Sequence, residues 1–290
     1  MRIFDPHIHM TSRTTDDYEA MAAAGIEAII EPAFWLGQPR TNLGSFTDYF
    51  DGLIGWERFR AGQFGIEHHC TMGLNPKEAN DEALAREVLD VLPRYLAKDR
   101  VVAVGEIGFD GMTPAEERAL TAQLELAAEH DLPVLVHTPH RDKMRGTERT
   151  LELVAASSLE PGKVLIDHNN ELTHQIVRDS GCWAGFTIYP DTKVDEHRFV
   201  AIAQEAGLDR TIVNSAADWG KSDPLKVPKT VAAMLEAGFA EAEVQRVVWD
   251  NPVEFFGQSG RLELAESGAD GVDRMATFAG NSVLRGERPE

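Results

Sequence analysis

The amino-acid sequence predicts a single-domain α/β protein with the (β/α)8 barrel fold. The observations behind this prediction are the chain length, eight short apolar runs and the helical stretches between them. The 290 residues are close to the usual size of such a barrel. The runs interpreted as strands are residues 2–5, 27–31, 65–72, 101–106, 133–137, 163–168, 182–188 and 210–214. Regular strand and helix alternation predicts a parallel sheet, and eight repeats favour a closed barrel over an open sheet.

The composition of individual runs supports this interpretation. Strands covered on both faces read as nearly continuous apolar stretches, as do Val-Val-Ala-Val at 101–104 and Pro-Val-Leu-Val at 133–136. Neither a Gly-x-Gly-x-x-Gly motif nor a Walker-type glycine loop occurs in the sequence, which disfavours an open nucleotide-binding sheet.

Helix boundaries are marked by capping residues. A helix start is predicted before the helical stretch 119–130 by Thr113, Pro114 and Glu116. Thr is a common N-cap residue, Pro is common at the first helical position, and Glu three residues after the cap completes a capping box. Gly25 and Gly181 follow helical stretches and predict their ends.

Two segments fall outside the regular alternation. Residues 34–62 are long for a connection between a strand and a helix and are rich in aromatic residues. We weigh a lid or oligomer contact equally against local packing of those aromatics. After about Leu262 the periodicity fades, so we expect a barrel at residues 1–260 and a peripheral tail at 261–290.

Composition narrows the classes of function. Hydrophobic residues make up 43% and charged residues 26%, as in ordinary soluble enzymes. The net charge of −20 disfavours a broad nucleic-acid surface, which needs many Lys and Arg side chains. The sequence shows no signal peptide or long apolar stretch, and Cys70 and Cys182 stand apart. We therefore expect a cytoplasmic protein without a membrane partner or a disulfide framework.

Six metal-ligand side chains occur at the ends of the expected strands, where barrel residues meet at one mouth. They are His7, His9, Glu106, His137, His168 and Asp218. His7 and His9 share one strand face, so both imidazoles can point to one ion. Each side chain also has a structural alternative: a hydrogen-bonded histidine, a helix-capping or ion-paired carboxylate, or a turn residue in the case of Asp218. Their joint position favours a metal site.

These residues also carry a family resemblance. The sequence resembles the TatD-type metal-dependent hydrolases of the amidohydrolase superfamily from residue 1 to about 257. The motifs are Asp-Pro-His-Ile-His at 5–9, Gly-Glu-Ile-Gly-Phe-Asp at 105–110, Pro-Val-Leu-Val-His-Thr at 133–138, His168, Ala217-Asp218 and Asn-Pro-Val-Glu-Phe-Phe-Gly at 251–257.

The resemblance implies a centre with two divalent ions. His7, His9 and Asp218 would hold one ion, His137 and His168 the other, and Glu106 would bridge both. Such a centre supplies hydroxide near neutral pH and polarises the substrate oxygen, and Asp218 would accept the proton of the water. We favour zinc, with Mn, Mg, Fe or Ni as alternatives. Asp5 is a candidate for orienting an imidazole.

The positions expected to face the substrate differ from the family pattern. Pro139 stands where the family usually has Arg, and Asn75 stands where His is common. Residues 169–171 read Asn-Asn-Glu, where the family usually has small and aromatic residues. Ala216 and Ala217 precede the aspartate in place of Glu-Thr. Our candidate substrate-binding residues are Asp110, His140, Arg141, Asn170 and Trp219.

The leading hypothesis is therefore a metal-dependent hydrolase that cleaves a small-molecule ester, lactone, amide or phosphoester. The first alternative is a DNase or 3′-exonuclease, which the family resemblance suggests and the net charge disfavours. An alternative from another class is a metal-stabilised barrel without catalytic activity that acts as a pathway partner. The sequence leaves the oligomeric state open, including a homo-oligomer.

Overall fold

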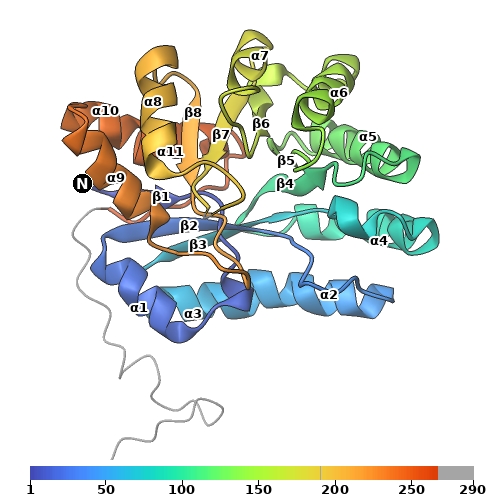
Figure 1. The fold of residues 1–290 in the computed structure, drawn as a ribbon. Coiled ribbons are helices and arrows are strands. Elements are labelled where there is room, and N and C mark those ends of the chain that lie inside the picture. The colour runs from blue at the N-terminus through green and yellow to red at the C-terminus, as the bar shows by residue number, and fades with distance from the viewer. Residues whose placement is uncertain (190, 267–290) are drawn as a thin grey trace, which may run out of the picture.

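Eight parallel strands form a nearly closed barrel surrounded by helices (Figure 1). The structure is a computed structural model that describes residues 1–189 and 191–266. The strands pair in sequence order and are β1 Ile3–Asp5, β2 Ile26–Pro32, β3 Glu67–Met72, β4 Val101–Gly108, β5 Val134–His137, β6 Val164–Ile166, β7 Trp183–Thr187 and β8 Thr211–Asn214. The predicted (β/α)8 barrel is confirmed, and the expected strand ends lie within a few residues of the observed ones.

The two edges of the sheet meet just beyond β1 and β8. The N–H of Ala216 donates to the carbonyl oxygen of His7 at 2.7 Å, and the N–H of His9 donates to the carbonyl oxygen of Ala217 at 2.9 Å. These bonds place the residues after β1 beside those after β8, at the mouth where we expected the site.

The helices lie outside the strands (Figure 1). They are α1 Thr15–Ala23, α2 Leu43–Asp51, α3 Arg58–Gly62, α4 Glu82–Leu96, α5 Pro114–Glu129, α6 Lys143–Ala156, α7 His174–Asp179, α8 Glu196–Ala206, α9 Lys226–Glu236, α10 Glu241–Gln245 and α11 Asn251–Gly257. Thr113 accepts the N–H of Glu116 at 3.2 Å, so the predicted cap of α5 is confirmed. Gly25 and Gly181, after α1 and α7, have φ of 87° and 83°, as helix-ending glycines do.

The interior of the barrel below the mouth is filled by apolar side chains. Phe4, Trp183, Trp249, Phe255 and Phe256 belong to one buried cluster that includes side chains from the strands and from α11. The rings of Trp183 and Phe255 lie 5.6 Å apart, and those of Phe255 and Phe256 lie 4.9 Å apart. Among the described residues, apolar side chains therefore fill the lower end of the barrel, opposite to the mouth.

The segment 34–62 contains α2, a π-helix at Gly52–Glu57 and α3. Phe46 and Phe50 are buried, and Phe50 packs edge-on against Tyr95 of α4 at 5.0 Å. Most of its aromatics therefore pack locally, whereas Trp56 stays 46% exposed. The lid or oligomer contact stays a prediction.

The residues after α11 cross the lower end of the barrel. The guanidinium of Arg2 donates to the carbonyl oxygen of Ala265 at 2.8 Å, and the N–H of Glu263 donates to Nε2 of His69 at 3.1 Å. The expected tail at 261–290 lies mostly outside the described residues.

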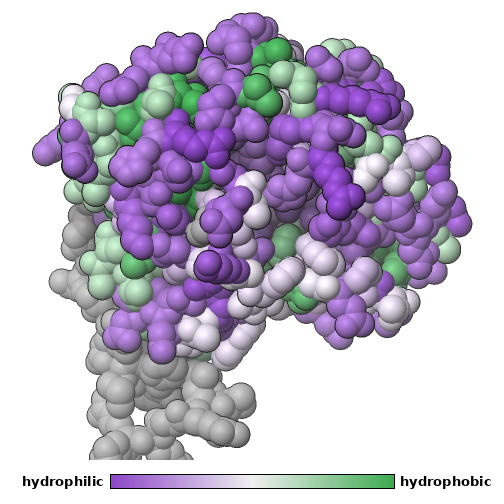
Figure 2. Space-filling model, in the orientation of Figure 1, coloured by the Kyte–Doolittle hydropathy of each residue, from purple (hydrophilic) through white to green (hydrophobic). Residues whose placement is uncertain are grey.

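The surface and the two cysteines bear on the expectations drawn from the composition. Hydrophilic side chains cover most of the face shown in Figure 2. Cys70 and Cys182 are both buried free thiols. None of the helices in residues 1–189 and 191–266 has the length and apolar character needed to span a bilayer.

Candidate metal centre

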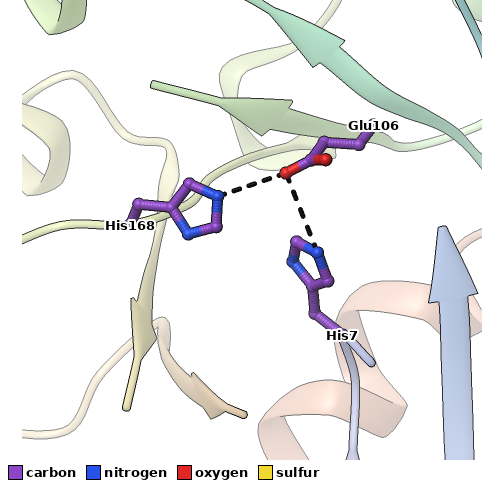
Figure 3. Close-up of side chains that lie close together, drawn as sticks. All are labelled: His7, Glu106 and His168. Carbon is purple, nitrogen blue, oxygen red and sulfur yellow. Dashed lines mark hydrogen bonds and ion pairs between the residues drawn. The ribbon is translucent and has the colours of Figure 1, made fainter. Parts of the chain in front are cut away.

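Glu106 is the centre of a cluster of histidines at the mouth of the barrel. Its Oε1 lies 3.1 Å from Nδ1 of His137, 3.1 Å from Nε2 of His168 and 3.7 Å from Nε2 of His7. Figure 3 shows His7 and His168 pointing toward this oxygen from separate segments. The atoms offered by His7, Glu106 and His168 all lie within 4.8 Å of one another, which suits a shared metal ion.

The glycines beside Glu106 let β4 lie close to β5. A Cβ on Gly108, whose φ is 139°, would collide with the backbone oxygen of His137. A Cβ on Gly105 would lie 2.8 Å from Cβ of Leu135. The Gly-Glu-Ile-Gly motif therefore combines a ligand with the close strand contact that brings His137 to it.

His7 and His9 follow β1 and face each other through their Nε2 atoms at 3.0 Å. The opposite nitrogen of His7, Nδ1, lies 2.6 Å from Oδ2 of Asp167. Because a carboxylate accepts hydrogen bonds, this contact places the proton of His7 on Nδ1 and leaves the lone pair of Nε2 directed at the cluster. His9 stacks on Phe34 at 3.9 Å.

His168 is oriented in the same way from the end of β6. Its Nδ1 lies 2.7 Å from the hydroxyl oxygen of Thr187, and its backbone N–H donates to Asp167 at 2.7 Å. Its φ of 63° is in the left-handed region, which residues other than glycine adopt infrequently. The Nε2 of His168 then faces Glu106 and His137, 3.1 and 3.0 Å away.

The electrostatics of this cluster suit a cation. Burial opposes ionisation of Glu106, but His137 and His168 hold the pKa of this carboxyl well below its usual range. Burial lowers the pKa of both His9 and His168, so both imidazoles are neutral. A buried carboxylate among histidine ring nitrogens that point to one place is the donor set of Zn²⁺ and similar ions. The residues present therefore fit a metal centre.

Asp218 lines the same cavity, but its carboxylate forms no hydrogen bond or ion pair with the other five metal-ligand candidates, which all lie within the described residues. Its Oδ1 accepts the hydroxyl of Tyr189 at 2.9 Å and the N–H of Gly220 at 2.8 Å. The backbone N–H of Asp218 donates to Ser222 at 3.0 Å. The carboxylate is thus fixed at the cavity wall.

The cavity above the cluster has a volume of about 230 Å³. Asp110 and His140 line it, as expected from the sequence. Trp219 packs edge-on against the lining residue Trp35 at 6.0 Å, whereas Arg141 and Asn170 do not belong to the lining. Sequence analysis overlooked the lining residues Phe34, Trp35, Lys77, Tyr189, Thr192 and Lys193.

The expected role of Asp5 is wrong. Its Oδ1 accepts the backbone N–H groups of His7 and Ser215 at 3.3 and 3.2 Å, so it fixes loops and not an imidazole. Asp167 performs the orienting role, since it contacts the ring of His7 and the backbone of His168. Asp167 directly follows the apolar strand β6, but Asp5 also lies at a strand end, so no signal in the sequence distinguished the two.

Three imidazoles converge on a buried carboxylate at the mouth of a parallel barrel, and a fourth, that of His9, lies beside them. This arrangement is typical of metal-dependent hydrolases. The comparisons with known proteins agree. The chain belongs to the TatD related DNase family, whose model matches residues 4–257. It is a metal-dependent hydrolase of that family, as the sequence motifs predicted.

Three similar proteins illustrate the relationship. An uncharacterized metal-dependent hydrolase from Methanocaldococcus jannaschii is 29% identical over 259 residues, which cover 88% of this chain and 99% of the relative. A 3′-5′ ssDNA/RNA exonuclease TatD from Cronobacter turicensis is 34% identical over 144 residues, 47% of this chain and 48% of the relative. The crystal structure of a TatD-like protein from Archaeoglobus fulgidus has a TM-score of 0.72 and 26% identity, and covers 87% of this chain and 99% of that chain.

Proposed function

We propose that this hydrolase uses a binuclear divalent-metal centre to cleave a small-molecule ester, lactone, amide or phosphoester. His7, His9 and Asp218 would hold one ion, His137 and His168 the other, with Glu106 between them. The observation that carries the proposal is the convergence of three histidine rings on Oε1 of Glu106. A carboxylate among ring nitrogens of histidines from different strands suits two ions that share one bridge.

Bound ions of this type lower the pKa of a water molecule and polarise the oxygen of the substrate. The residues of the chain supply the remaining steps. Asp218 would accept a proton and return it to the leaving group. Its position in the cavity lining and its hydrogen bond from Tyr189 support this role. Asp167 accepts a hydrogen bond from Nδ1–H of His7. This bond keeps the lone pair of Nε2 available to a metal ion.

The cavity and the net charge support a small substrate. A volume of about 230 Å³ lies below the range of pockets that take drug-sized ligands, roughly 300–1,000 Å³. The chain carries a net charge of −20, which repels a polyanion at long range.

Metal analysis and a substrate panel test the proposal. The purified protein should contain close to two divalent ions per chain, zinc first among the candidates. Glu106→Ala should contain fewer than one ion and lose activity against every substrate of a panel of lactones, amides and phosphoesters. Glu125→Ala, which removes an exposed carboxylate from α5, is the matched control and should retain both properties.

Two results would contradict the proposal. One is a full complement of ions and normal turnover in Glu106→Ala. The other is a purified protein that contains no metal and gains no activity when zinc or manganese is added.

A 3′-exonuclease is the second candidate function, and the similarity to exonucleases over 144 residues favours it. Its test is the degradation of a labelled single strand by purified, metal-loaded enzyme. Activity that persists through purification and disappears in Asp218→Asn would reverse our ranking. Equal degradation by both proteins would indicate a contaminating nuclease.

A further inference from the structure

Lys193 is a lysine of the catalytic cavity that neither the sequence motifs nor the proposed chemistry uses. It lies in the loop between β7 and α8, and its Nζ is 3.5 Å from Nε2 of His168. The cavity-lining Lys77 forms an ion pair with Asp110 at 2.7 Å, whereas Lys193 forms none with the carboxylates of the described residues. A lysine without an ion pair to any carboxylate of the described residues therefore lies next to a metal-ligand histidine.

The position of Lys193 is fixed by its surroundings. The guanidinium of Arg198 donates to the carbonyl oxygen of Lys193 at 2.8 Å, and Arg198 is itself paired with Glu171 at 2.7 Å. The N–H of Tyr189 donates to the carbonyl oxygen of Val194 at 3.1 Å. The ammonium group also lies 5.3 Å from the centre of the Tyr189 ring. These contacts fix the backbone of the loop from which the side chain of Lys193 extends to the candidate metal site.

A lysine side chain in this position favours an anionic ligand. Bound divalent ions add positive charge a few ångströms from Nζ of Lys193, and a partly buried charge without a partner is unfavourable. Glu106 is surrounded by His7, His137 and His168, and Asp218 is held by Tyr189 and Gly220. A negatively charged ligand in the cavity would supply the ion-pair partner that these carboxylates do not supply.

We propose that Lys193 binds an anionic oxygen of the substrate, a phosphoryl or carboxylate oxygen next to the bond that is cleaved. This inference rests on the proposed hydrolase function and narrows its substrates to small acids and phosphate esters. Lys193 is then a specificity-determining residue, because an ammonium group forms strong charge-assisted hydrogen bonds with such oxygens. Neutral lactones and amides would bind more weakly.

Anion binding measured by calorimetry tests this inference separately from turnover. Inorganic phosphate and acetate are titrated into wild type, Lys193→Met and Lys193→Arg, each with its metal content measured. Loss of a charge-assisted hydrogen bond should raise the Kd of the relevant anion about 10–100-fold in Lys193→Met. Lys193→Arg should restore binding to within a few-fold. Lys221→Met removes an exposed lysine and controls for the change in net charge.

The two anions distinguish the two sources of the oxygen. A Lys193-dependent Kd for phosphate identifies a phosphoryl group, and one for acetate identifies a carboxylate. The KM of the matching anionic substrate should rise by the same factor, with kcat less affected.

Equal Kd values for both anions in wild type and Lys193→Met would overturn the role of Lys193. If wild type with bound metal cleaves neutral lactones and its anion binding does not depend on Lys193, only this inference fails. If the protein binds no metal and cleaves nothing, the proposed function fails. Anion binding by the metal-free protein then decides the role of Lys193 by itself.

Discussion

Nδ1 of His7 and Oδ2 of Asp167 lie 2.6 Å apart, although the two residues are 160 positions apart in the sequence. Both side chains are buried, with 1% and 0% of their surface exposed. The histidines His7 and His168 hold the pKa of Asp167 well below its usual range despite its burial. This pair links the ends of β1 and β6, and it determines which nitrogen of His7 faces the metal site.

Replacing Asp167 should weaken metal binding without removing a ligand. In Asp167→Asn the neutral amide orients His7 less strongly, so we expect the metal affinity to fall about 10–100-fold. Competition with a coloured chelator measures this affinity. Asp90→Asn, which changes an exposed residue of α4, is the matched control. An unchanged affinity in a folded Asp167→Asn protein would contradict the orienting role.

Replacing Asp218 should reduce turnover more than replacing its partner Tyr189. Asp218→Asn removes the proton acceptor, and we expect kcat to fall by roughly 10²–10⁴. Tyr189→Phe removes one hydrogen bond to Oδ1, and about a tenfold loss is expected. Steady-state kinetics measures both effects, and metal analysis of the same samples separates lost proton transfer from lost ions. A larger effect of Tyr189→Phe would contradict this order.

Truncation of Phe255 should affect stability but not chemistry. Phe255 is fully buried at the lower end of the barrel, so Phe255→Ala should reduce the free energy of unfolding by about 3–5 kcal/mol. Urea denaturation measures this change. The partly exposed Leu235 of α9 gives the control Leu235→Ala, for which less than about 1 kcal/mol is expected. A large loss of kcat in folded Phe255→Ala would show that the two ends of the barrel are coupled.

His69 should make the protein less stable in acid. Burial and the nearby Arg100 lower the pKa of His69 to about 3, and its Nε2 accepts the N–H of Glu263. The unfolded chain takes up this proton below about pH 6.5, whereas the folded protein does not until about pH 3. The contribution of His69 to stability is therefore complete above pH 6.5 and falls by up to about 1.4 kcal/mol per pH unit below it.

Urea denaturation of the metal-free protein at pH 7.5, 6 and 5 tests this expectation. His69→Gln should show a shallower decline than wild type, since glutamine does not titrate. His197→Gln, at an exposed position of α8, serves as the control. Parallel curves for wild type and His69→Gln would contradict the prediction.

The parts of the fold that the sequence predicted are those dictated by local patterns. Residues 101–104 are apolar because β4 is buried on both faces, and Thr113 and Gly181 mark helix ends through their own backbone chemistry. The metal-ligand candidates were recognisable because buried strands seldom end in charged or imidazole side chains unless these have a partner.

Other features depend on contacts between distant residues. Lys193 is one lysine in a polar loop, and only the fold brings it to His168. Asp5 and Asp167 are both carboxylates at strand ends, and the sequence could not decide which of them contacts His7. Arg141 and Asn170 follow site histidines closely, yet the backbone carries them away from the cavity lining.

The contact between Arg2 and Ala265 brings the first and last described segments together at the end of the barrel opposite to the metal site. The connections between the strands can therefore be changed without changing the residues of the metal site. A circular permutant that links Ala265 back to Met1 and opens the chain between α4 and β4, near Lys98 and Asp99, would leave every metal-ligand candidate attached to its own strand. Its metal content would show whether the site depends on strand packing alone.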